Sequence, residues 1–597
     1  MMTSLSDTRL TSLRALLKDE NLNGLIIPHS DEYQNEYPPD YTRRLAWLTG
    51  FTGSAGTAIV LTDQAAIFSD GRYTTQLQQQ VNTSYWHCLH NGNTPPATWL
   101  AHNAPTNSLI GYDPRLTSTA DLAPYKAINT ITLVPTPYNF IDKLWTQRPK
   151  APMMPAFIHP LDYAGENSEK KRKHLAQNLV HQGLEATIIS DSASIAWLLN
   201  IRGNDIPCTP VVLAFALLYA NASVDLFLPV EKISPDVRTW LGNDVRIFSP
   251  ETLESRLARF AHKNIGVDPH NSVWFHQTLT HYGAHVVDFP DPCLIAKAHK
   301  NPIEQEGMRR AHLYDGIALC RFLHWLETKN YHTTEIAATE QLMAFRAEQS
   351  DYVEDSFPPI SGSGPNGAII HYHATPHHYR TLEPNELYLI DSGGQYRQGT
   401  TDVTRTLWTG PEAPSDTLKN IFTRVLKGNL TLARTRFPVG TSGSALDVLA
   451  RAALWEIGLD YDHGTGHGVG SFLSVHEGPA RISKTPHTAM LEEGMVLSNE
   501  PGFYQPDSYG IRLETLMLVK PASSSALSPE SHRQFLEFET LTLVPFDRKL
   551  INPTLLGADN LQALNIYHDR VMASIGPHLP PETKNWLQNA CAPLTLT

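Results

Sequence analysis

The sequence has few cysteines, no long apolar run and no surplus of basic charge. Its five cysteines are scattered over 597 residues without paired spacing, which excludes a disulfide framework and is typical of a reducing cytosol. The longest apolar run, 211–220, is far too short to cross a bilayer, and we interpret it as a buried strand. A net charge of −13 disfavours a general affinity for nucleic acid. We therefore expect a cytoplasmic protein that binds neither nucleic acid nor membranes.

An internal repeat divides the first half of the chain. The segment 45–53 aligns with 195–203, since both contain Ala-Trp-Leu and end in glycine. Each is preceded by a helical pattern and a β-rich run: 8–20 and 24–28 in the first copy, 169–182 and 186–190 in the second. Such a repeat predicts two related α/β domains, with the proline-rich segment 148–155 as the linker between them.

The second half has a different pattern. A helix-patterned stretch, 303–329, opens it, and short β-like runs then alternate with Gly and Pro turns to about residue 545, which is typical of an α+β unit. A further helical pattern covers 561–575, within a small helical appendage. The predicted domain ranges are therefore 1–150, 151–300, 301–545 and 546–597.

Five residues in the last third have the composition of a two-metal ligand set. Asp391 ends an apolar strand-like run, and Asp402 follows eleven positions later, so a strand, a turn and a returning strand would place them side by side. Four carboxylates cannot share an apolar pocket unless cations neutralise them. Oxygen donors with one imidazole suit a pair of Mn²⁺, Co²⁺ or Zn²⁺ ions better than one structural zinc. The set is Asp391, Asp402, His467, Glu500 and Glu514.

Taken singly, each of these residues has a more ordinary interpretation. An aspartate after a strand is commonly a turn former, and a glutamate before proline is usually just extended backbone. The glycine-rich segment 464–470 lacks the Lys-Ser/Thr pair of a P-loop and the strand–helix context of a dinucleotide site, so no nucleotide cofactor is expected. Only the five together favour a metal site.

The ordered motifs closely resemble those of the pita-bread metallopeptidases, and within them the three-domain cytosolic aminopeptidase P group. The resemblance extends forward to 50–58, 69–73 and 202–205, and therefore covers nearly the whole chain. The stretches that carry it are 367–372, 388–393, 400–406, 464–470, 475–479, 498–502 and 510–514.

The resemblance implies a mixed fold, α/β and α+β: two creatinase-like α/β domains, then a pita-bread catalytic domain and a short C-terminal helical extension. It implies that Asp391 ligates one metal terminally, that His467 and Glu500 ligate the other, and that Asp402 and Glu514 bridge the pair. The implied activity releases the N-terminal residue from peptides with proline second, by attack of a hydroxide held by two metal ions. Manganese suits the site best, and a homodimer is expected by resemblance only.

Accessory residues are also implied. His371 and His476 resemble histidines that hydrogen-bond substrate and the tetrahedral oxyanion, and His463 resembles one near the proline pocket. Glu500 resembles a ligand that also handles the proton of the water, and Arg512 is expected to steady a ligand carboxylate. His373, His377 and His378 depart from the family pattern; a solvated loop is favoured there over an additional metal contact.

Two other functions stay open. One is a prolidase, with the same metals but a preference for dipeptides. The other is a peptide-binding scaffold that has lost its metals, a class that typically lacks some of the ligands found here.

Overall fold

The chain forms two units in a computed structural model that describes residues 5–523, 528 and 532–596. The first unit comprises the chain up to His159, with 166–207 and 211–294. The second comprises 160–165, 208–210 and the chain from Ile295 onward. The backbone thus enters the second unit twice before it remains there.

Unit 1 contains two six-stranded sheets with the same topology. The strand orders are β4-β3-β2-β1-β5-β6 and β12-β11-β10-β8-β13-β14, and corresponding neighbours pair in the same direction. The strands are β1 (Gly24–Pro28), β2 (Thr57–Leu61), β3 (Ala65–Ser69), β4 (His87–His90), β5 (Ser108–Tyr112), β6 (Ile131–Pro135), β8 (Ala186–Ile189), β10 (Phe215–Tyr219), β11 (Val224–Phe227), β12 (Val245–Phe248), β13 (Asn264–Val267) and β14 (His285–Asp288). A short pair, β7 (Phe157–Ile158) with β9 (Ile201–Arg202), completes the unit.

Equivalent helices accompany the two sheets. The lead-in helices are α1 (Leu5–Asp19) and α8 (Ser168–His181), and the repeated segments hold α2 (Arg44–Thr49) and α9 (Ser192–Leu199). The predicted repeat of α/β domains is therefore confirmed. The other helices that end before residue 300 are α3 (Thr74–Gln80), α4 (Pro96–Asn103), α5 (Thr119–Lys126), α6 (Phe140–Leu144), α7 (Leu161–Ala164), α10 (Pro235–Leu241), α11 (Leu253–Leu257), α12 (Val273–His281) and α13 (Cys293–Ala298).

The predicted strand at 211–220 is correct only in its second half. β10 begins at Phe215. Residues 211–214 are buried, but the N–H of Leu213 donates to the Asp205 carboxylate at 2.8 Å. A side-chain acceptor therefore replaces the neighbouring strand at this point.

Unit 2 has a three-stranded sheet, β16-β17-β20, and a six-stranded sheet, β21-β28-β27-β24-β22-β23, with the small ladders β15-β18-β19 and β25-β26. The strands are β15 (Tyr352–Asp355), β16 (Ile360–Ser363), β17 (Leu387–Ser392), β18 (Gly394–Tyr396), β19 (Gly399–Thr400), β20 (Val403–Trp408), β21 (Arg436–Pro438), β22 (Gly466–Gly468), β23 (Glu477–Ile482), β24 (Val496–Asn499), β25 (Gly502–Gln505), β26 (Tyr509–Arg512), β27 (Thr515–Pro521) and β28 (Phe535–Thr540).

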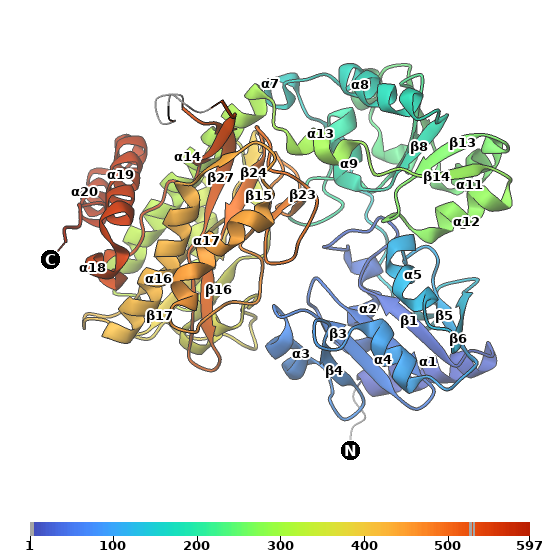
Figure 1. The fold of residues 1–597 in the computed structure, drawn as a ribbon, viewed down its shortest axis with the longest axis horizontal. Coiled ribbons are helices and arrows are strands. Elements are labelled where there is room, and N and C mark those ends of the chain that lie inside the picture. The colour runs from blue at the N-terminus through green and yellow to red at the C-terminus, as the bar shows by residue number, and fades with distance from the viewer. Residues whose placement is uncertain (1–4, 524–527, 529–531, 597) are drawn as a thin grey trace. The chain divides into compact units, whose positions relative to one another are not determined.

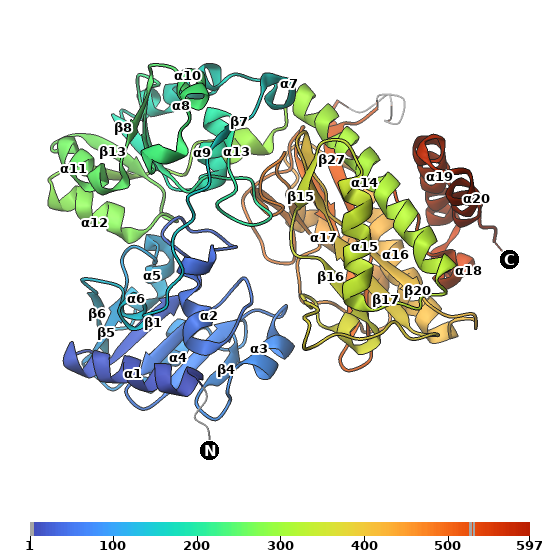
Figure 2. The same ribbon diagram turned by 180° about the vertical axis from the view of Figure 1, so that it is seen from behind.

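Two helix pairs flank these sheets. Figures 1 and 2, taken from opposite sides, show α14 (Pro302–Thr328) with α15 (Glu335–Ala347) on one side and α16 (Asp416–Ala433) with α17 (Gly443–Trp455) on the other. The sequence predicts α14 but indicates only β-like runs where α16 and α17 lie. Nevertheless α16 carries a helical apolar stripe, because Phe422, Val425, Leu426 and Leu430 are buried together.

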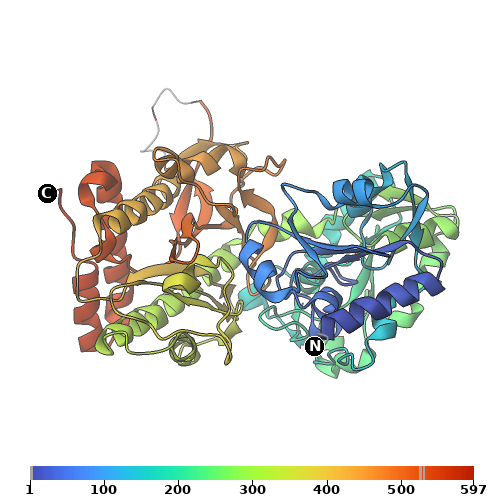
Figure 3. The ribbon, with the colours of Figure 1, turned by 90° about the horizontal axis from the view of Figure 1, so that it is seen from below.

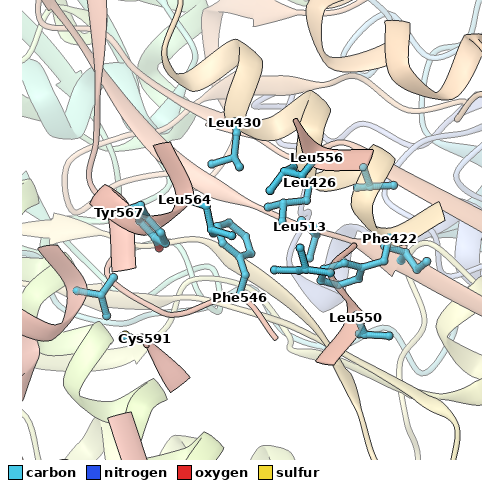
Figure 4. Packing of buried hydrophobic residues seen from close by; sticks show 14 of the residues in the cluster. Phe422, Leu426, Leu430, Leu513, Phe546, Leu550, Leu556, Leu564, Tyr567 and Cys591 are labelled. Atoms are coloured by element: carbon cyan, nitrogen blue, oxygen red, sulfur yellow. The ribbon is translucent and has the colours of Figure 1, made fainter. Parts of the chain in front are cut away.

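The C-terminal helices share the core of this unit. They are α18 (Pro553–Leu556), α19 (Ala558–Ile575) and α20 (Pro581–Ala590), and in Figure 3 the red C-terminal helices lie along the light-green α14. Figure 4 shows Leu564 and Tyr567 of α19 packed with Phe422 and Leu426 of α16. The expected combination of α/β domains, α+β unit and helical extension is therefore confirmed, and the extension is built into the same hydrophobic core.

Candidate metal centre and active site

Strands β17 and β20 bring Asp391 and Asp402 together. Asp391 pairs with Thr404 across this antiparallel ladder, two residues beyond Asp402. The chain between the strands turns back through the β18–β19 ladder. Gly393 permits that turn, because a Cβ there would lie 1.9 Å from the carbonyl oxygen of Thr401. The spacing of eleven residues therefore does place the two carboxylates side by side.

Three ligand-type groups converge beside this hairpin. A carboxylate oxygen from each of Asp402 and Glu514 and a ring nitrogen of His467 lie within 4.8 Å of one another. His467 Nε2 lies 3.6 Å from Asp402 Oδ2 and 3.4 Å from Glu500 Oε1. His467 Nδ1 lies 3.0 Å from the Gly468 carbonyl, which can only accept, so Nδ1 carries the proton. Nε2 is therefore the basic nitrogen that faces the carboxylates.

Asp391 joins the cluster through Arg512, which donates from Nη2 to Asp391 Oδ2 at 2.7 Å. The other oxygen, Oδ1, is buried and has no hydrogen-bond partner among the described residues. A buried acceptor without a partner costs free energy, and a cation would satisfy it. The expected contact of Arg512 with this carboxylate is present, and the role of Asp391 as a metal ligand stays a prediction.

The four carboxylates carry more negative charge than the side chains around them neutralise. Burial, and then the charges of their neighbours, raise the pKa of Asp402 and of Glu514 well above the ordinary range. Burial also raises the pKa of Glu500 to about 7, against the opposing charge of Arg512. With one guanidinium among four carboxylates, the donor set fits divalent cations, which would neutralise the excess charge.

Hydroxyl groups fix the orientation of two carboxylates. Thr404 Oγ1 donates to Glu514 Oε2 at 2.8 Å, and Ser498 Oγ donates to Glu500 Oε1 at 3.1 Å. The same Ser498 hydroxyl accepts the N–H of His467 at 2.9 Å. Such contacts hold ligand atoms in place before an ion binds.

The accessory histidines lie around this cluster. The His476 ring is 4.3 Å from the His467 ring in an edge-to-face arrangement, and its charge lowers the pKa of Glu500. His371 follows Ile370, whose carbonyl accepts from Arg512 Nη2 at 3.3 Å. Both histidines are therefore next to residues that contact predicted ligands.

His463 is connected to Asp391 through Tyr504 and Arg512. His463 Nδ1 lies 2.7 Å from the Gly464 carbonyl and so donates, which leaves Nε2 to accept from the Tyr504 hydroxyl at 2.9 Å. Tyr504 in turn accepts from Arg512 Nη1 at 2.8 Å. Burial raises the pKa of Tyr504 to about 12, so it remains a neutral donor. The sequence analysis missed Tyr504, because a tyrosine in a strand carries no local signal of this role.

The extra histidines after His371 are exposed. This holds for His373, His377 and His378, and matches the solvated loop that was favoured. His378 also contacts Tyr372, with ring centroids 5.8 Å apart.

Other expectations concern the whole chain. The cysteines are all free thiols, and no helix of the described residues is long and apolar enough to span a membrane.

Models of known families match successive parts of the chain. A creatinase/prolidase N-terminal domain matches residues 9–143, and a second model of that description matches 147–304. Metallopeptidase family M24 matches 306–521, and the C-terminal region of peptidase M24 matches 534–594.

Several relatives align over the full length. Aminopeptidase P1 of Lotus japonicus is 34% identical, over 98% of this chain and 100% of the relative. A probable Xaa-Pro aminopeptidase P of Neurospora crassa is 37% identical, over 99% and 90%. Among solved structures, the X-prolyl aminopeptidase of Caenorhabditis elegans, described as a cytosolic enzyme with a di-nuclear active site, matches 100% of both chains with a TM-score of 0.94 and 32% identity.

Proposed function

The chain belongs to metallopeptidase family M24, and we propose that within it the protein is an Xaa-Pro aminopeptidase, a hydrolase that releases an N-terminal residue when proline follows. The observation that carries this proposal is the cluster of Asp402, Glu500 and Glu514 carboxylates around His467, with the His476 ring packed against that imidazole. The scaffold alternative is not favoured, because every expected ligand is present.

We propose that Asp391, Asp402, His467, Glu500 and Glu514 would together hold two divalent cations. A bound pair of such ions supplies a water of lowered pKa and polarises the scissile carbonyl. Manganese is the ion we favour, with zinc and cobalt as the alternatives, because oxygen donors dominate the set.

The protein's own side chains would position the substrate and move protons. We assign to Glu500 the acceptance of a proton from the attacking water, because its carboxylate lies in the ligand cluster, 3.4 Å from His467 Nε2. We assign to His371 and His476 the donation of hydrogen bonds to substrate and to the developing oxyanion. His463, oriented by Tyr504, would line the proline pocket.

Selectivity for proline has a simple physical basis. Proline forms a tertiary amide without an N–H, so a peptidase that requires that donor loses a contact. A pocket shaped around the pyrrolidine ring needs no such donor. A free amino group would be required ahead of proline because it would take up a position beside the carboxylate cluster that an acyl group cannot occupy.

Three further statements belong to the same proposal. The domain ranges are 1–150, 151–300, 301–545 and 546–597, which the family matches follow closely. The enzyme is cytoplasmic, which the free cysteines and the cytosolic Caenorhabditis relative support. It is a homodimer, which size-exclusion chromatography with light scattering would test.

The decisive assay compares matched peptides with the Mn²⁺-loaded enzyme: Xaa-Pro, Xaa-Pro-Xaa, Xaa-Ala-Xaa and N-acetylated Xaa-Pro-Xaa. We expect cleavage of the free Xaa-Pro-Xaa peptide, with selection seen in kcat/KM. A strong preference for the dipeptide would favour the prolidase alternative, and equal cleavage of the alanine or acetylated peptide would overturn the proposal. Chelator should abolish the activity and Mn²⁺ restore it, whereas full turnover in protein shown to be metal-free would refute the metal assignment.

A further inference from the structure

Glu335, the first residue of α15, is a fully buried carboxylate outside the metal centre. It accepts the main-chain N–H groups of Ser363 and Arg380, each at 2.7 Å. It also accepts the Asn366 side-chain amide at 3.0 Å and the Tyr372 hydroxyl at 2.9 Å. All four donors lie in one segment, 363–380, which carries His371.

These bonds are not needed to begin the helix. The N-cap of α15 is Thr334, whose hydroxyl accepts the N–H of Ala337 at 3.1 Å. The side chain of Glu335 therefore binds the segment 363–380 and does not cap the helix. A carboxylate offers about four acceptor sites, and here four neutral donors fill them. A buried anion with several such bonds is costly to disturb, so the loop is tied firmly to the helix.

The neighbours of His371 are fixed on both sides. The carbonyl of Ile370 accepts from Arg512, which also binds Asp391. The hydroxyl of Tyr372 donates to Glu335. Beyond this point the loop becomes exposed, at His373 and again from Thr375 to Tyr379. The position of His371 is therefore set by two anchors, one at the metal centre and one at α15.

We propose that Glu335 is a positioning residue for His371, and through it for substrate; the proposal rests on the aminopeptidase function above. Glu335→Gln would exchange one acceptor oxygen for an amide that faces N–H and O–H donors. The loop must then shift, and a misplacement of about 1 Å at a catalytic group can cost about 10²-fold in rate. The metal ligands do not contact Glu335, so metal content should be unchanged.

The test is a double-mutant cycle on kcat/KM, with Glu335→Gln introduced into the wild type and into His371→Ala. We expect a loss of about 10²-fold in the wild type and almost none in the His371→Ala background, because the group that Glu335 positions is then absent. An equal loss in both backgrounds would show a general structural role and overturn the proposal, as would an unchanged rate in the wild type.

A matched control is Asp547→Asn. Asp547 is a half-buried carboxylate of the same unit, and it accepts the N–H groups of Trp408 and Lys549 at 2.9 and 3.0 Å. Any effect of this variant should be the same with and without His371. If Glu335→Gln does not fold, Tyr372→Phe removes one donor only, and a several-fold loss should again require His371.

One readout does not depend on activity. The imidazole resonance of His371, assigned by its disappearance in His371→Ala, should shift in Glu335→Gln while the His476 resonance does not. An enzyme that cleaves no Xaa-Pro peptide but shows this shift would refute the proposed function and leave the positioning role intact. No shift in a folded, two-metal Glu335→Gln variant would refute the positioning role.

Discussion

Two buried clusters in the catalytic unit differ in how their negative charge is balanced. Glu477, next to His476, is paired with both Lys297 and Lys300, and all three side chains are buried. The candidate metal centre has four carboxylates, and among the described arginines and lysines only Arg512 lies within hydrogen-bond reach of one of them. The first cluster carries its own cations in the sequence, and the second leaves a large excess of negative charge.

The difference identifies which cluster depends on ions from solution. A buried charge must be paired, or its pKa shifts until it is neutral. The Glu477 carboxylate is paired with two ammonium groups without any ligand. At the metal centre the raised pKa values of Asp402 and Glu514 show that the protein alone does not balance the charge. We therefore expect chelation to affect one cluster and leave the other unchanged.

The largest effect is expected at the metal centre itself. Asp402→Ala removes a carboxylate that we propose serves both ions, so both ions should be lost and activity should fall below detection. Elemental analysis of the purified variant gives the metal count. Two tightly bound ions in Asp402→Ala would refute the bridging assignment and weaken the contrast with Glu477.

The next largest effect concerns stability at the other cluster. Glu477→Gln leaves two buried ammonium groups without a counter-charge, and should cost about 3–5 kcal/mol in the free energy of unfolding. Lys300→Met leaves the neutral pair of Glu477 and Lys297, and should cost less. Denaturant unfolding with and without chelator measures both. A greater loss in Lys300→Met, or a loss that depends on metal, would contradict the comparison.

His476 packs against His467 of the metal centre and precedes Glu477 in the chain. Its substitution therefore tests an effect on the reaction apart from an effect on stability. His476→Ala should lower kcat by about 10²–10³-fold, which corresponds to about 2.7–4 kcal/mol of transition-state stabilisation. The metal count should remain that of the wild type, and so should the denaturation midpoint. Loss of metal from this variant would show that His476 supports the ligands rather than the reaction.

The smallest effect concerns His568, a buried group that stays neutral and is not paired with an opposite charge in the described part of the chain. Burial, with the charges of Arg405 and Arg548, lowers the pKa of His568 from 6.5 to about 3, and its Nε2 accepts the N–H of Phe546. The unfolded chain therefore binds the proton first, so this contribution to stability is lost as pH falls below about 6.5, by about 1.4 kcal/mol per pH unit.

His568→Gln should accordingly show a weaker fall in melting temperature between pH 7.5 and pH 5.5 than the wild type, under the same metal conditions. The matched control is the exposed His377→Gln, which should follow the wild type. Identical pH dependence in all three proteins would contradict a neutral, buried His568.

Much of the site was predictable because its ligands carry local signals. Asp391 follows an apolar run, and His467 stands among glycines. Two supporting residues, Glu335 and Tyr504, carry none, and Arg512 was expected only through the family resemblance. Arg512 lies 121 positions from Asp391, and Glu335 lies 45 positions from the Arg380 N–H that it accepts. Nothing in the pattern around Glu335 or Tyr504 marks such a partner, because long-range hydrogen bonds depend on how strands and loops come together.

The fold was predictable to a similar degree and for similar reasons. The repeat and the ends of α14 follow from periodicity and capping, since Asn301 and Glu304 form a capping box before the apolar pattern. The helices α16 and α17 were missed although α16 is amphipathic, because glycines and prolines in the flanking segments suggested a succession of turns.

The two early entries of the backbone into the second unit have a consequence for how the protein is made. The segment 208–210 leaves the ribosome long before Gln395, whose side-chain amide donates to the Cys208 carbonyl at 2.9 Å and to the Leu473 carbonyl at 2.7 Å. During synthesis the segment 208–210 cannot form its contacts with the second unit until most of the chain has emerged. A fragment that starts at Ile295 would lack residues 208–210. The second unit therefore cannot be expressed as one continuous fragment without losing part of its own structure.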